Sequence, residues 1–488
     1  MATPSTDLFA GIDIGTGGVR VVILDEAGDL VAGHAEPIAT VTDAGSCTVE
    51  QDPSLWWTAT VTGLQKSLVS CPRGELRALA ISGTSGTIVP VDGAGEALRP
   101  AVLYRDARAD AAAERLNQAA AAWTQASGVR FQSSSGLAKV LWLVDTEPEV
   151  VSRTRVFAHA ADVIVARLTG EVGLTDWSHA LKTGYDLVAG AWPSFLDAVG
   201  IPVAKLPRVL PPGATLGRVT AAAGATTSVP AGVPVIAGMT DGCMAQVAAG
   251  AVQPGDWNTS LGTTLVLKGV TRTRLVDPRG RVYSHRLPSG AWLPGAASNT
   301  GGACLDEFPR AALPALDARA LAETPTGRVV YPLTLRGERF PFLAPQARGF
   351  GEAVADPVER RFAARLEGVA FVERLGYAVL EDLGASGGGV IGSTGGGSRS
   401  RAWLQVRADV LNRTLRRPVL EGAAAGAAML AAAGVTGRDL ADVARTMVRI
   451  GCVVEPRSGV RSAYDEAYAR FVGDCRARGY LDSPARSR

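Results

Sequence analysis

Residues 236–269 read IAGMTDGCMAQVAAGAVQPGDWNTSLGTTLVLKG, and this stretch contains two different patterns. Asp241 follows an apolar run and precedes residues 242–252, whose composition predicts a helix. Residues 261–264, Leu-Gly-Thr-Thr, lie between two strand-like runs. An acid at a strand-to-helix junction can reach a bound molecule, and a Gly-Thr turn exposes N–H groups and hydroxyls that suit phosphate oxygens. The stretch therefore offers a candidate general base and a candidate phosphate-binding turn.

The second pattern occurs again near the start of the chain. Residues 8–24 read LFAGIDIGTGGVRVVIL, which predicts a strand, a Gly-rich turn and a second strand. The β-branched run after Gly18 excludes the usual dinucleotide-binding fingerprint, in which a helix follows the glycines. A pair of such hairpins resembles the plan of the superfamily of sugar kinases, 70-kDa heat-shock proteins and actin, in which each half contributes one phosphate loop. Two ordinary β-hairpins with Gly turns are the alternative.

Composition limits the class of protein. A net charge of +2 provides no electrostatic footprint for nucleic acid or a membrane surface. The six Cys are scattered without a C-x-x-C pair, and the four His lack zinc spacing. The N-terminus lacks a signal-peptide pattern, and the Ala-rich residues 423–435 are too few to span a bilayer. We expect a cytoplasmic protein with no nucleic-acid or membrane partner.

The length of 488 residues predicts two large domains. Residues 211–232, rich in Pro, Gly and Thr, have the composition of a linker, and we place a boundary and hinge near 233–240. The expected domains are residues 1–236 and 237–488. Two long helices are expected over residues 355–383, and Asp52-Pro53 predicts the start of a helix that ends near Val69.

Nine stretches, taken in order, resemble the FGGY family of carbohydrate kinases over nearly the whole chain. They are DIGTGGVR (13–20), SGTSGTIVPVD (82–92), LYRDARAD (103–110), SGLAKVLWLVDTEPE (135–149), GMTDGCMAQVAAGAVQPGDWNTSLGTT (238–264), SNTGG (298–302), GERFPFLAP (337–345), STGGGSRSRAWLQVRADVLNR (393–413) and EGAAAGAAMLAA (421–432). The resemblance implies an α/β fold with two actin-like (ribonuclease H-like) domains and a central cleft. It also implies ATP and Mg²⁺ as cofactors, and transfer of the γ-phosphoryl group to a hydroxyl of a small-molecule sugar, polyol or sugar acid.

The resemblance also assigns roles to single residues. Asp241 matches the catalytic base; capping of the helix that follows is its alternative role. Asp13 is expected to hold Mg²⁺ through waters, together with Asp241, and an Asx-turn is the alternative for Asp13. The residues matching the nucleotide site are Asp13, Gly15, Thr16, Gly262, Thr263, Thr264, Gly301, Gly395, Gly396, Gly397, Ser400 and Trp403.

The expected sugar contacts are Thr84, Ser85, Tyr104, Asp106, Thr240 and Asp241. Polyols need short side chains that both donate and accept, and an acid that accepts from hydroxyls. Plain turn residues are the alternative for Thr84 and Ser85, and core packing is the alternative for Tyr104 and for Trp403.

Departures from the family pattern concern the substrate. Residues 84–87, Thr-Ser-Gly-Thr, stand where typical bacterial xylulose kinases read Gln-Met-His-Gly, and Gly242 stands where they have Asn. Gly-Thr-Ser at 83–85, Thr-Asp at 240–241 and Gly-Glu-Arg-Phe-Pro at 337–341 are more similar to small ribulose kinases. We therefore expect D-ribulose as the substrate, phosphorylated on O5, with D-xylulose as the alternative. L-ribulose, glycerol, erythritol and gluconate stay open, as do an actin-like ATPase switch without sugar chemistry, an inactive family member and a homodimer.

Overall fold

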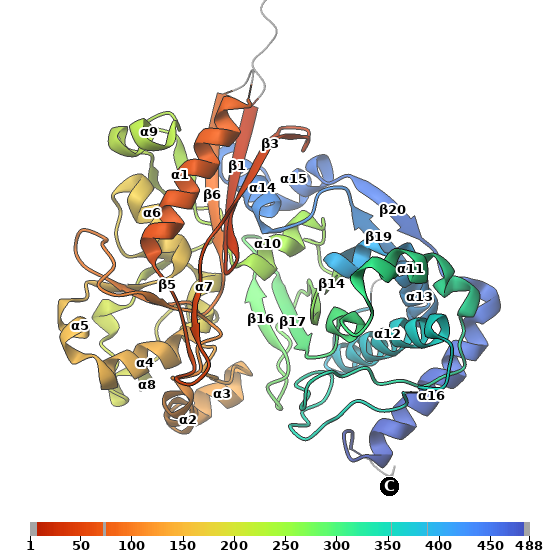
Figure 1. Ribbon diagram of the computed structural model, residues 1–488. Coiled ribbons are helices and arrows are strands. Elements are labelled where there is room, and N and C mark those ends of the chain that lie inside the picture. Colours follow the sequence, from red (N-terminus) through yellow and green to blue (C-terminus); the bar gives the residue numbers. More distant parts are fainter. Residues whose placement is uncertain (1–6, 72–74, 353, 388, 483–488) are drawn as a thin grey trace, which may run out of the picture. The chain divides into compact units, whose positions relative to one another are not determined.

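The computed structural model describes residues 7–71, 75–352, 354–387 and 389–482, which form two compact units. Unit 1 comprises the chain up to Val252 together with His285–Ala291 and Leu420–Arg449. Unit 2 comprises Gln253–Ser284, Trp292–Val419 and the chain from Ile450 onward. Each unit contains a mixed β-sheet covered by helices (Figure 1).

The sheet of unit 1 begins with an antiparallel meander. Strands β1, β2 and β3 pair in that order, and β6 and then β13 add to the free side of β1 in parallel orientation. The edge strand β12 runs antiparallel to β13. The strand bounds are β1 (Asp7–Gly15), β2 (Gly18–Asp25), β3 (Leu30–Pro37), β6 (Glu75–Gly83), β12 (Thr215–Arg218) and β13 (Pro234–Ile236).

Helices α1 (Pro53–Val69) and α14 (Ala423–Thr436) cover opposite faces of this sheet (Figure 1). A Cβ at Gly63 of α1 would lie 2.7 Å from Cγ2 of Val21. A Cβ at Gly11 would lie 1.8 Å from the Ala424 carbonyl oxygen of α14. Gly11 pairs with the residue after Val21, so the two contacts are on opposite faces because side chains alternate along a strand. Small residues therefore bring α14 directly onto β1.

Helix α10 (Asp241–Ala248) packs against α14 in the same way, since a Cβ at Gly426 would lie 1.9 Å from the Met244 carbonyl oxygen. Both helices belong to unit 1, so the division of the compact units differs from the predicted boundary between residues 236 and 237. Residues 211–232 differ from a linker as well. They contain β12 and α9 (Ala221–Thr227), and β12 is hydrogen-bonded into the sheet.

The sheet of unit 2 has the order β16-β17-β15-β14-β18-β19-β20 and contains the same pattern. Strands β14, β15 and β17 form an antiparallel meander, and β18 and β19 extend it in parallel from β14. The bounds are β14 (Trp257–Leu261), β15 (Leu265–Gly269), β16 (Tyr283–Arg286), β17 (Trp292–Ser298), β18 (Val390–Thr394), β19 (Thr414–Pro418) and β20 (Ile450–Val454). The repeat of strand order and direction is what the duplicated hairpin predicts.

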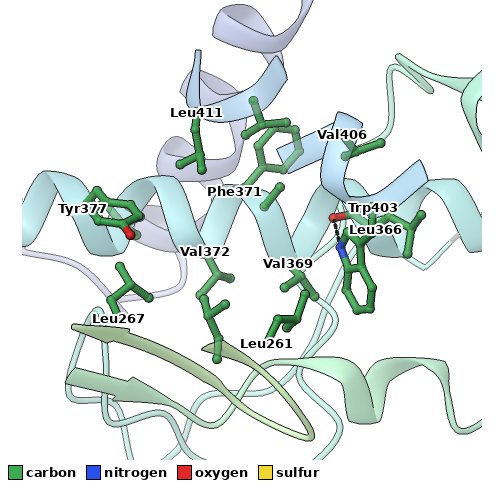
Figure 2. Close-up of a cluster of buried hydrophobic side chains, with 14 of the residues drawn as sticks. Leu261, Leu267, Leu366, Val369, Phe371, Val372, Tyr377, Trp403, Val406 and Leu411 are labelled. Carbon is green, nitrogen blue, oxygen red and sulfur yellow. Dashed lines mark hydrogen bonds between the residues drawn. The ribbon is translucent and has the colours of Figure 1, made fainter. Parts of the chain in front are cut away.

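The core of unit 2 lies between its sheet and helices α12 (Val358–Asp382) and α13 (Arg401–Leu411) (Figure 2). The prediction of two helices over residues 355–383 is wrong, because α12 is one helix of 25 residues. No proline interrupts it, and Gly376 allows Phe340 and Leu267 to approach: a Cβ there would lie 2.7 Å from the Phe340 ring. The ion pair between Arg407 of α13 and Glu373 of α12 has both side chains fully buried.

Smaller elements complete the two units. In unit 1 they are β4 (Val41–Asp43), β5 (Thr48–Gln51), β7 (Val89–Val91), β8 (Ala101–Val102), β9 (Val156–Ala158), β10 (Leu174–Asp176), β11 (Arg208–Leu210), α2 (Asp110–Ala119), α3 (Ala121–Ser127), α4 (Gly136–Thr146), α5 (Pro148–Arg153), α6 (Ala160–Thr169), α7 (Trp177–Lys182), α8 (Phe195–Ala198) and α15 (Leu440–Met447). In unit 2 they are α11 (Leu313–Ala320) and α16 (Arg461–Ala477). No helix within the described residues combines the length and the apolar character that crossing a membrane requires.

Candidate functional site

Most of the residues predicted to contact the sugar lie at the carboxyl ends of three neighbouring strands of unit 1. Asp13 of β1 pairs with Ser82 of β6, and Gly83 forms a parallel bridge with Thr240, just beyond β13. Ligands of α/β proteins bind outside the carboxyl ends of parallel strands. The fold thus brings Asp13, residues 82–85 and Asp241 together beside the carboxyl ends of these strands.

Asp13 is buried in an unusual environment for a carboxylate. Its side chain is 8% exposed, and Oδ1 has no hydrogen-bond partner among the described residues. Burial, followed by the charge of Asp241, raises the pKa of Asp13 from 3.8 to about 6, against the opposing charge of Arg20. A bound cation would relieve both effects, because it neutralises the two carboxylates and gives Oδ1 a partner. These two acids therefore fit the expected Mg²⁺.

The described residues contain no group of three or more His, Cys, Asp or Glu side chains that could hold a metal ion. Magnesium usually keeps several waters and binds through one or two carboxylates together with substrate phosphates. A pair of acids is thus the donor set expected for Mg²⁺ that arrives with a nucleotide.

Asp241 is the first residue of α10 and is half-buried. Its Oδ1 accepts a hydrogen bond of 2.7 Å from the N–H of Gly242. The N-cap position belongs to Thr240, so Asp241 lies one residue inside the helix and differs from a simple N-cap. Its position at the start of the helix, only partly buried, is one from which a carboxylate can reach a bound hydroxyl as a general base does.

The turn between β1 and β2 is held firmly and is open on one side. Gly15 pairs with Gly18, which leaves Thr16 and Gly17 at the tip. The Thr16 carbonyl accepts hydrogen bonds from Thr40 Oγ1 at 3.0 Å and from Gln51 Nε2 at 2.8 Å. A Cβ at Gly17 would meet no atom within 4 Å. A ligand can therefore approach the backbone at Gly17 without a side chain in the way.

The loop after β6 differs in detail from the prediction. Thr84 is buried, and its hydroxyl is 2.9 Å from that of Thr87. Ser85 is half-buried, and its hydroxyl makes no hydrogen bond with another described residue. A Cβ at Gly86 would lie 2.2 Å from the Ser134 carbonyl oxygen, so position 86 has no room for a histidine. Of this loop, Ser85 is the residue best placed to contact a sugar.

Two predicted sugar contacts, Tyr104 and Asp106, lie in the segment after β8 and have different surroundings. Tyr104 is half-buried, and its hydroxyl makes no hydrogen bond with a described residue. Asp106 is 1% exposed and accepts from the Val49 N–H at 2.8 Å and from Arg108 Nη2 at 2.7 Å. Burial alone would raise the pKa of Asp106, but these bonds, with that of Arg108 first, lower it. Because these hydrogen bonds already use the carboxylate oxygens of Asp106, they argue against the predicted sugar contact there. The carboxylate holds the segment in place instead.

Thr240 is also engaged within the protein. It is 2% exposed, its N–H donates to Ser178 Oγ at 2.8 Å, and its hydroxyl lies 3.3 Å from Cys243 Sγ. The residue therefore holds the junction before Asp241 in place, and it offers little polar surface to a sugar.

Unit 2 contains a pocket of about 780 Å³ that gathers half of the predicted nucleotide-site residues. Its lining includes Gly262, Thr263, Gly396, Gly397, Ser400 and Trp403. A pocket of this size suits a drug-sized ligand or a cofactor. Residues 262–263, 302–303 and 396–400, from three separate loops, share one wall of the pocket. The first of these loops contains the second predicted phosphate loop, and the third contains the predicted Gly-rich run.

Close packing of these loops explains several of their glycines. The Gly302 N–H donates to the Gly262 carbonyl at 2.8 Å. A Cβ at Gly301 would lie 2.5 Å from Thr264 Cα, and one at Gly395, where φ is +86°, would lie 2.7 Å from the Leu261 carbonyl oxygen. Gly301, Thr264 and Gly395 are absent from the pocket lining.

The far end of the pocket is built from α11 and α13. Ser400 caps α13 by accepting from the Trp403 N–H at 2.8 Å, and its hydroxyl donates to the Asp317 carboxylate. Trp403 is 3% exposed, and its indole N–H donates to the Leu366 carbonyl at 3.1 Å (Figure 2). Its ring belongs to the core and also lines the pocket, so the core interpretation of Trp403 holds and the nucleotide contact stays a prediction. Sequence reasoning missed Phe308, Arg310 and Asp317, which also line the pocket and carry no recognisable motif.

Comparison with known proteins decides the family. The N-terminal domain of the FGGY family of carbohydrate kinases matches residues 8–248, and the C-terminal domain of that family matches residues 257–435. The chain belongs to the FGGY family of carbohydrate kinases. As a member it is an ATP-dependent sugar kinase, and the prediction of an α/β fold with two actin-like domains is confirmed.

Three relatives illustrate the similarity. The chain is 32% identical to the xylulose kinase of Streptomyces rubiginosus over 462 residues, which cover 91% of this chain and 92% of that protein. It is 30% identical to the xylulose kinase of Escherichia coli K12, over 87% of this chain and 89% of that protein. The crystal structure of a xyloylose kinase from Brucella ovis superposes with a TM-score of 0.89 at 28% identity, over 97% of this chain and 100% of that one.

Proposed function

We propose that this FGGY kinase transfers the γ-phosphoryl group of ATP to the terminal hydroxyl of a ketopentose, and that D-xylulose is the preferred acceptor. The similarity to xylulose kinases over nine-tenths of the chain supports D-xylulose better than the D-ribulose expected from residues 83–85 and 337–341. The observation that carries the reaction is the pair of Asp13, near the end of β1, and Asp241, at the start of α10, with Asp13 Oδ1 lacking a partner among the described residues.

In this proposal Asp241 orients the acceptor hydroxyl and accepts its proton as the new P–O bond forms. The transition state of phosphoryl transfer is loose, so the proton leaves late and a carboxylate is a sufficient base. The N–H groups at the tips of the two turns, those of Thr16 and Thr263, donate to phosphate oxygens. Asp13 and Asp241 would hold Mg²⁺, which would supply neutralisation of the charge on the phosphates.

The adenosine part is assigned to the pocket of unit 2, against Gly396, Gly397 and Trp403. The acceptor is assigned to Ser85 and Tyr104 of unit 1, whose hydroxyls make no hydrogen bond with other described residues. D-Ribulose and D-xylulose differ only in the configuration at C3. A hydroxyl left unpaired on binding loses about 1–3 kcal/mol, which is about tenfold or more in specificity.

The test is a comparison of kcat/KM for D-xylulose, D-ribulose, L-ribulose, glycerol and gluconate by coupled ADP release. We expect D-xylulose to exceed D-ribulose by about tenfold, the value of one paired hydroxyl. Ser85→Ala should raise the KM for the ketopentose and leave that for ATP unchanged. A preference for D-ribulose would overturn the proposed acceptor, and a preference for a non-ketose would exclude ketopentoses altogether. ATP hydrolysis that no sugar stimulates would favour an actin-like switch.

A further inference from the structure

Helix α7 carries two fully buried side chains, Ser178 and His179, and each contacts a different segment near the proposed sugar site. Ser178 Oγ accepts the Thr240 N–H at 2.8 Å, and Thr240 immediately precedes Asp241. His179 Nε2 lies 3.3 Å from the carbonyl oxygen of Gly83, which immediately precedes Thr84. Gly83 and Thr240 are themselves bridge partners. One short helix therefore touches the last residue before the acceptor loop and the last residue before the proposed base.

Asp176, the N-cap of α7, organises both side chains. Its Oδ1 accepts from the Ser178 N–H at 2.7 Å and from the Ser178 hydroxyl at 2.5 Å. Its Oδ2 pairs with His179 Nδ1. Because the Ser178 proton is committed to Asp176, the lone pairs of its oxygen are available for the Thr240 N–H.

The hydrogen bonds of His179 determine its protonation. Nδ1 faces a carboxylate and Nε2 faces a carbonyl, so both neighbours are acceptors and the ring donates on both sides only when it is doubly protonated. Burial alone would lower the pKa of His179, but Asp176 raises it to about 9. The other charges that act on the ring are Asp162 of α6 and Asp241 of α10, and the His159 ring is 5.4 Å away.

We propose that Ser178 and His179 are positioning residues that set the distance between the acceptor loop, residues 83–87, and Asp241. The inference rests on the proposed function, because it assigns the acceptor to that loop and the base to Asp241. A misplacement of about 1 Å between reacting groups can lower the rate on the order of 10²-fold. The contacts of Ser178 with Thr240 and of His179 with Gly83 come from one buried helix and prevent such a displacement.

His159 provides a matched control within the same buried cluster. It is fully buried like His179, and its Nδ1 lies 2.7 Å from Asp162 Oδ2 and 3.0 Å from Thr175 Oγ1. Its Nε2 lies 2.9 Å from Thr183 Oγ1. None of these partners belongs to the acceptor loop or to α10. Replacement of His159 therefore tests the effect of disturbing the cluster without releasing either held segment.

The experiment compares His179→Asn, His179→Gln, Ser178→Ala and His159→Asn in the full-length protein. An Asn amide can reach Asp176 from the position of Nδ1, whereas a Gln amide can reach the Gly83 carbonyl from the position of Nε2. We expect His179→Asn to lower kcat by roughly 10- to 100-fold with the KM for ATP unchanged, and Ser178→Ala to act similarly. His179→Gln should recover most of the lost kcat, and His159→Asn should lower kcat by no more than about threefold, as for a change remote from the reacting groups.

Equal losses of kcat in His159→Asn and His179→Asn would overturn the proposal, because they would indicate general packing. Unchanged kcat in both His179→Asn and Ser178→Ala would also overturn it. A second measurement is independent of turnover: amide hydrogen exchange over residues 82–87 and 239–243 should be faster in Ser178→Ala and His179→Asn than in the wild type and in His159→Asn. Unchanged exchange would overturn the positioning role. Wild-type protein that phosphorylates no sugar would instead overturn the proposed function and leave the exchange result to be judged separately.

Discussion

At the scale of single residues, the proposed chemistry depends on two acids in different surroundings. Asp241 is half-buried at the start of α10, where its carboxylate is partly accessible. Asp13 is buried, and its charge is opposed by its surroundings and by Asp241. The first acid is therefore suited to accept a proton, and the second is suited to hold a cation.

Asp241→Asn should keep binding of ATP and sugar and lose turnover. The amide has nearly the same shape but cannot accept the proton, and general-base and orientation effects are worth roughly 10²–10⁴-fold in rate. Calorimetry with each substrate and steady-state kinetics separate the two properties. Turnover within a few-fold of the wild type would remove Asp241 from the role of base.

Asp13→Asn should stabilise the metal-free protein at neutral pH and impair its Mg·ATP complex. The folded protein holds the Asp13 proton up to about pH 6, whereas the unfolded chain releases it near 3.8. Folding therefore binds a proton in this window, so stability decreases as the pH rises from about 4 to about 6. The loss above that window is on the order of 1–3 kcal/mol.

Thermal unfolding in EDTA at pH 4.5 and pH 8, values chosen inside and above this window, measures the effect. The melting temperature of Asp13→Asn should exceed that of the wild type at the higher pH, and the difference should shrink at the lower pH. A difference that is the same at both pH values would contradict the raised pKa of Asp13. The variant should bind sugar as the wild type does, because Asp13 is assigned to the nucleotide and metal.

At the scale of elements, two adjacent glycines of the run between β18 and α13, Gly396 and Gly397, have different surroundings. A Cβ at Gly397 would lie 2.5 Å from the Leu261 side chain, whereas one at Gly396 would meet no atom within 4 Å. Both residues line the pocket of unit 2. Packing against Leu261 therefore excludes a larger residue at position 397. At position 396, a larger residue would be opposed only by a ligand bound in the pocket.

We expect Gly397→Ala to lower the stability of unit 2 by about 1–3 kcal/mol, as overpacking does. Gly396→Ala should leave the melting temperature unchanged and raise the KM for ATP about two- to tenfold, the value of one weakened contact. Thermal unfolding and ATP kinetics on both variants provide the comparison, each variant serving as the control for the other. An unchanged KM for ATP in Gly396→Ala would place the nucleotide elsewhere.

At the scale of the whole molecule, the proposal divides the substrates between the units, with the acceptor on unit 1 and the nucleotide on unit 2. Water competes for the phosphoryl group, and kinases commonly exclude it by closing domains around their substrates. The hinge expected near 233–240 is unsuitable, because β13 and Thr240 are paired with β6 and Gly83 within unit 1. The chain passes between the units after Val252, Ser284, Ala291, Val419 and Arg449, and we expect any hinge there.

Small-angle scattering tests this expectation. Saturating sugar and nucleotide together should reduce the radius of gyration, and Asp241→Asn allows the measurement without turnover. Sugar alone and nucleotide alone serve as controls for the effect of each ligand. Scattering curves that coincide in all four conditions would contradict a closing motion.

Much of this protein was predictable from local sequence. The β1–β2 and β14–β15 hairpins, the Asp241 junction and the cap of α1 depend on a few adjacent residues, whose preferences act at short range. The Gly-rich turns were recognisable for the same reason, because few residues other than glycine allow a backbone to approach a ligand so closely. Asp106 looked like a free acid in sequence, but its carboxylate is used by Arg108 and Val49.

The sequence by itself determined the family and the two-fold repeat of the sheet, since each is encoded in contiguous motifs, and it predicts Asp13 and Asp241 as the principal acids. Tertiary structure decided which of the predicted residues are accessible. It left Gly301, Thr264 and Gly395 out of the pocket lining, attached residues 420–449 to unit 1, and joined Ser178 and His179 to segments 62 and 96 residues distant. Burial and hydrogen-bond satisfaction depend on atoms from remote parts of the chain, which become neighbours only when the chain folds.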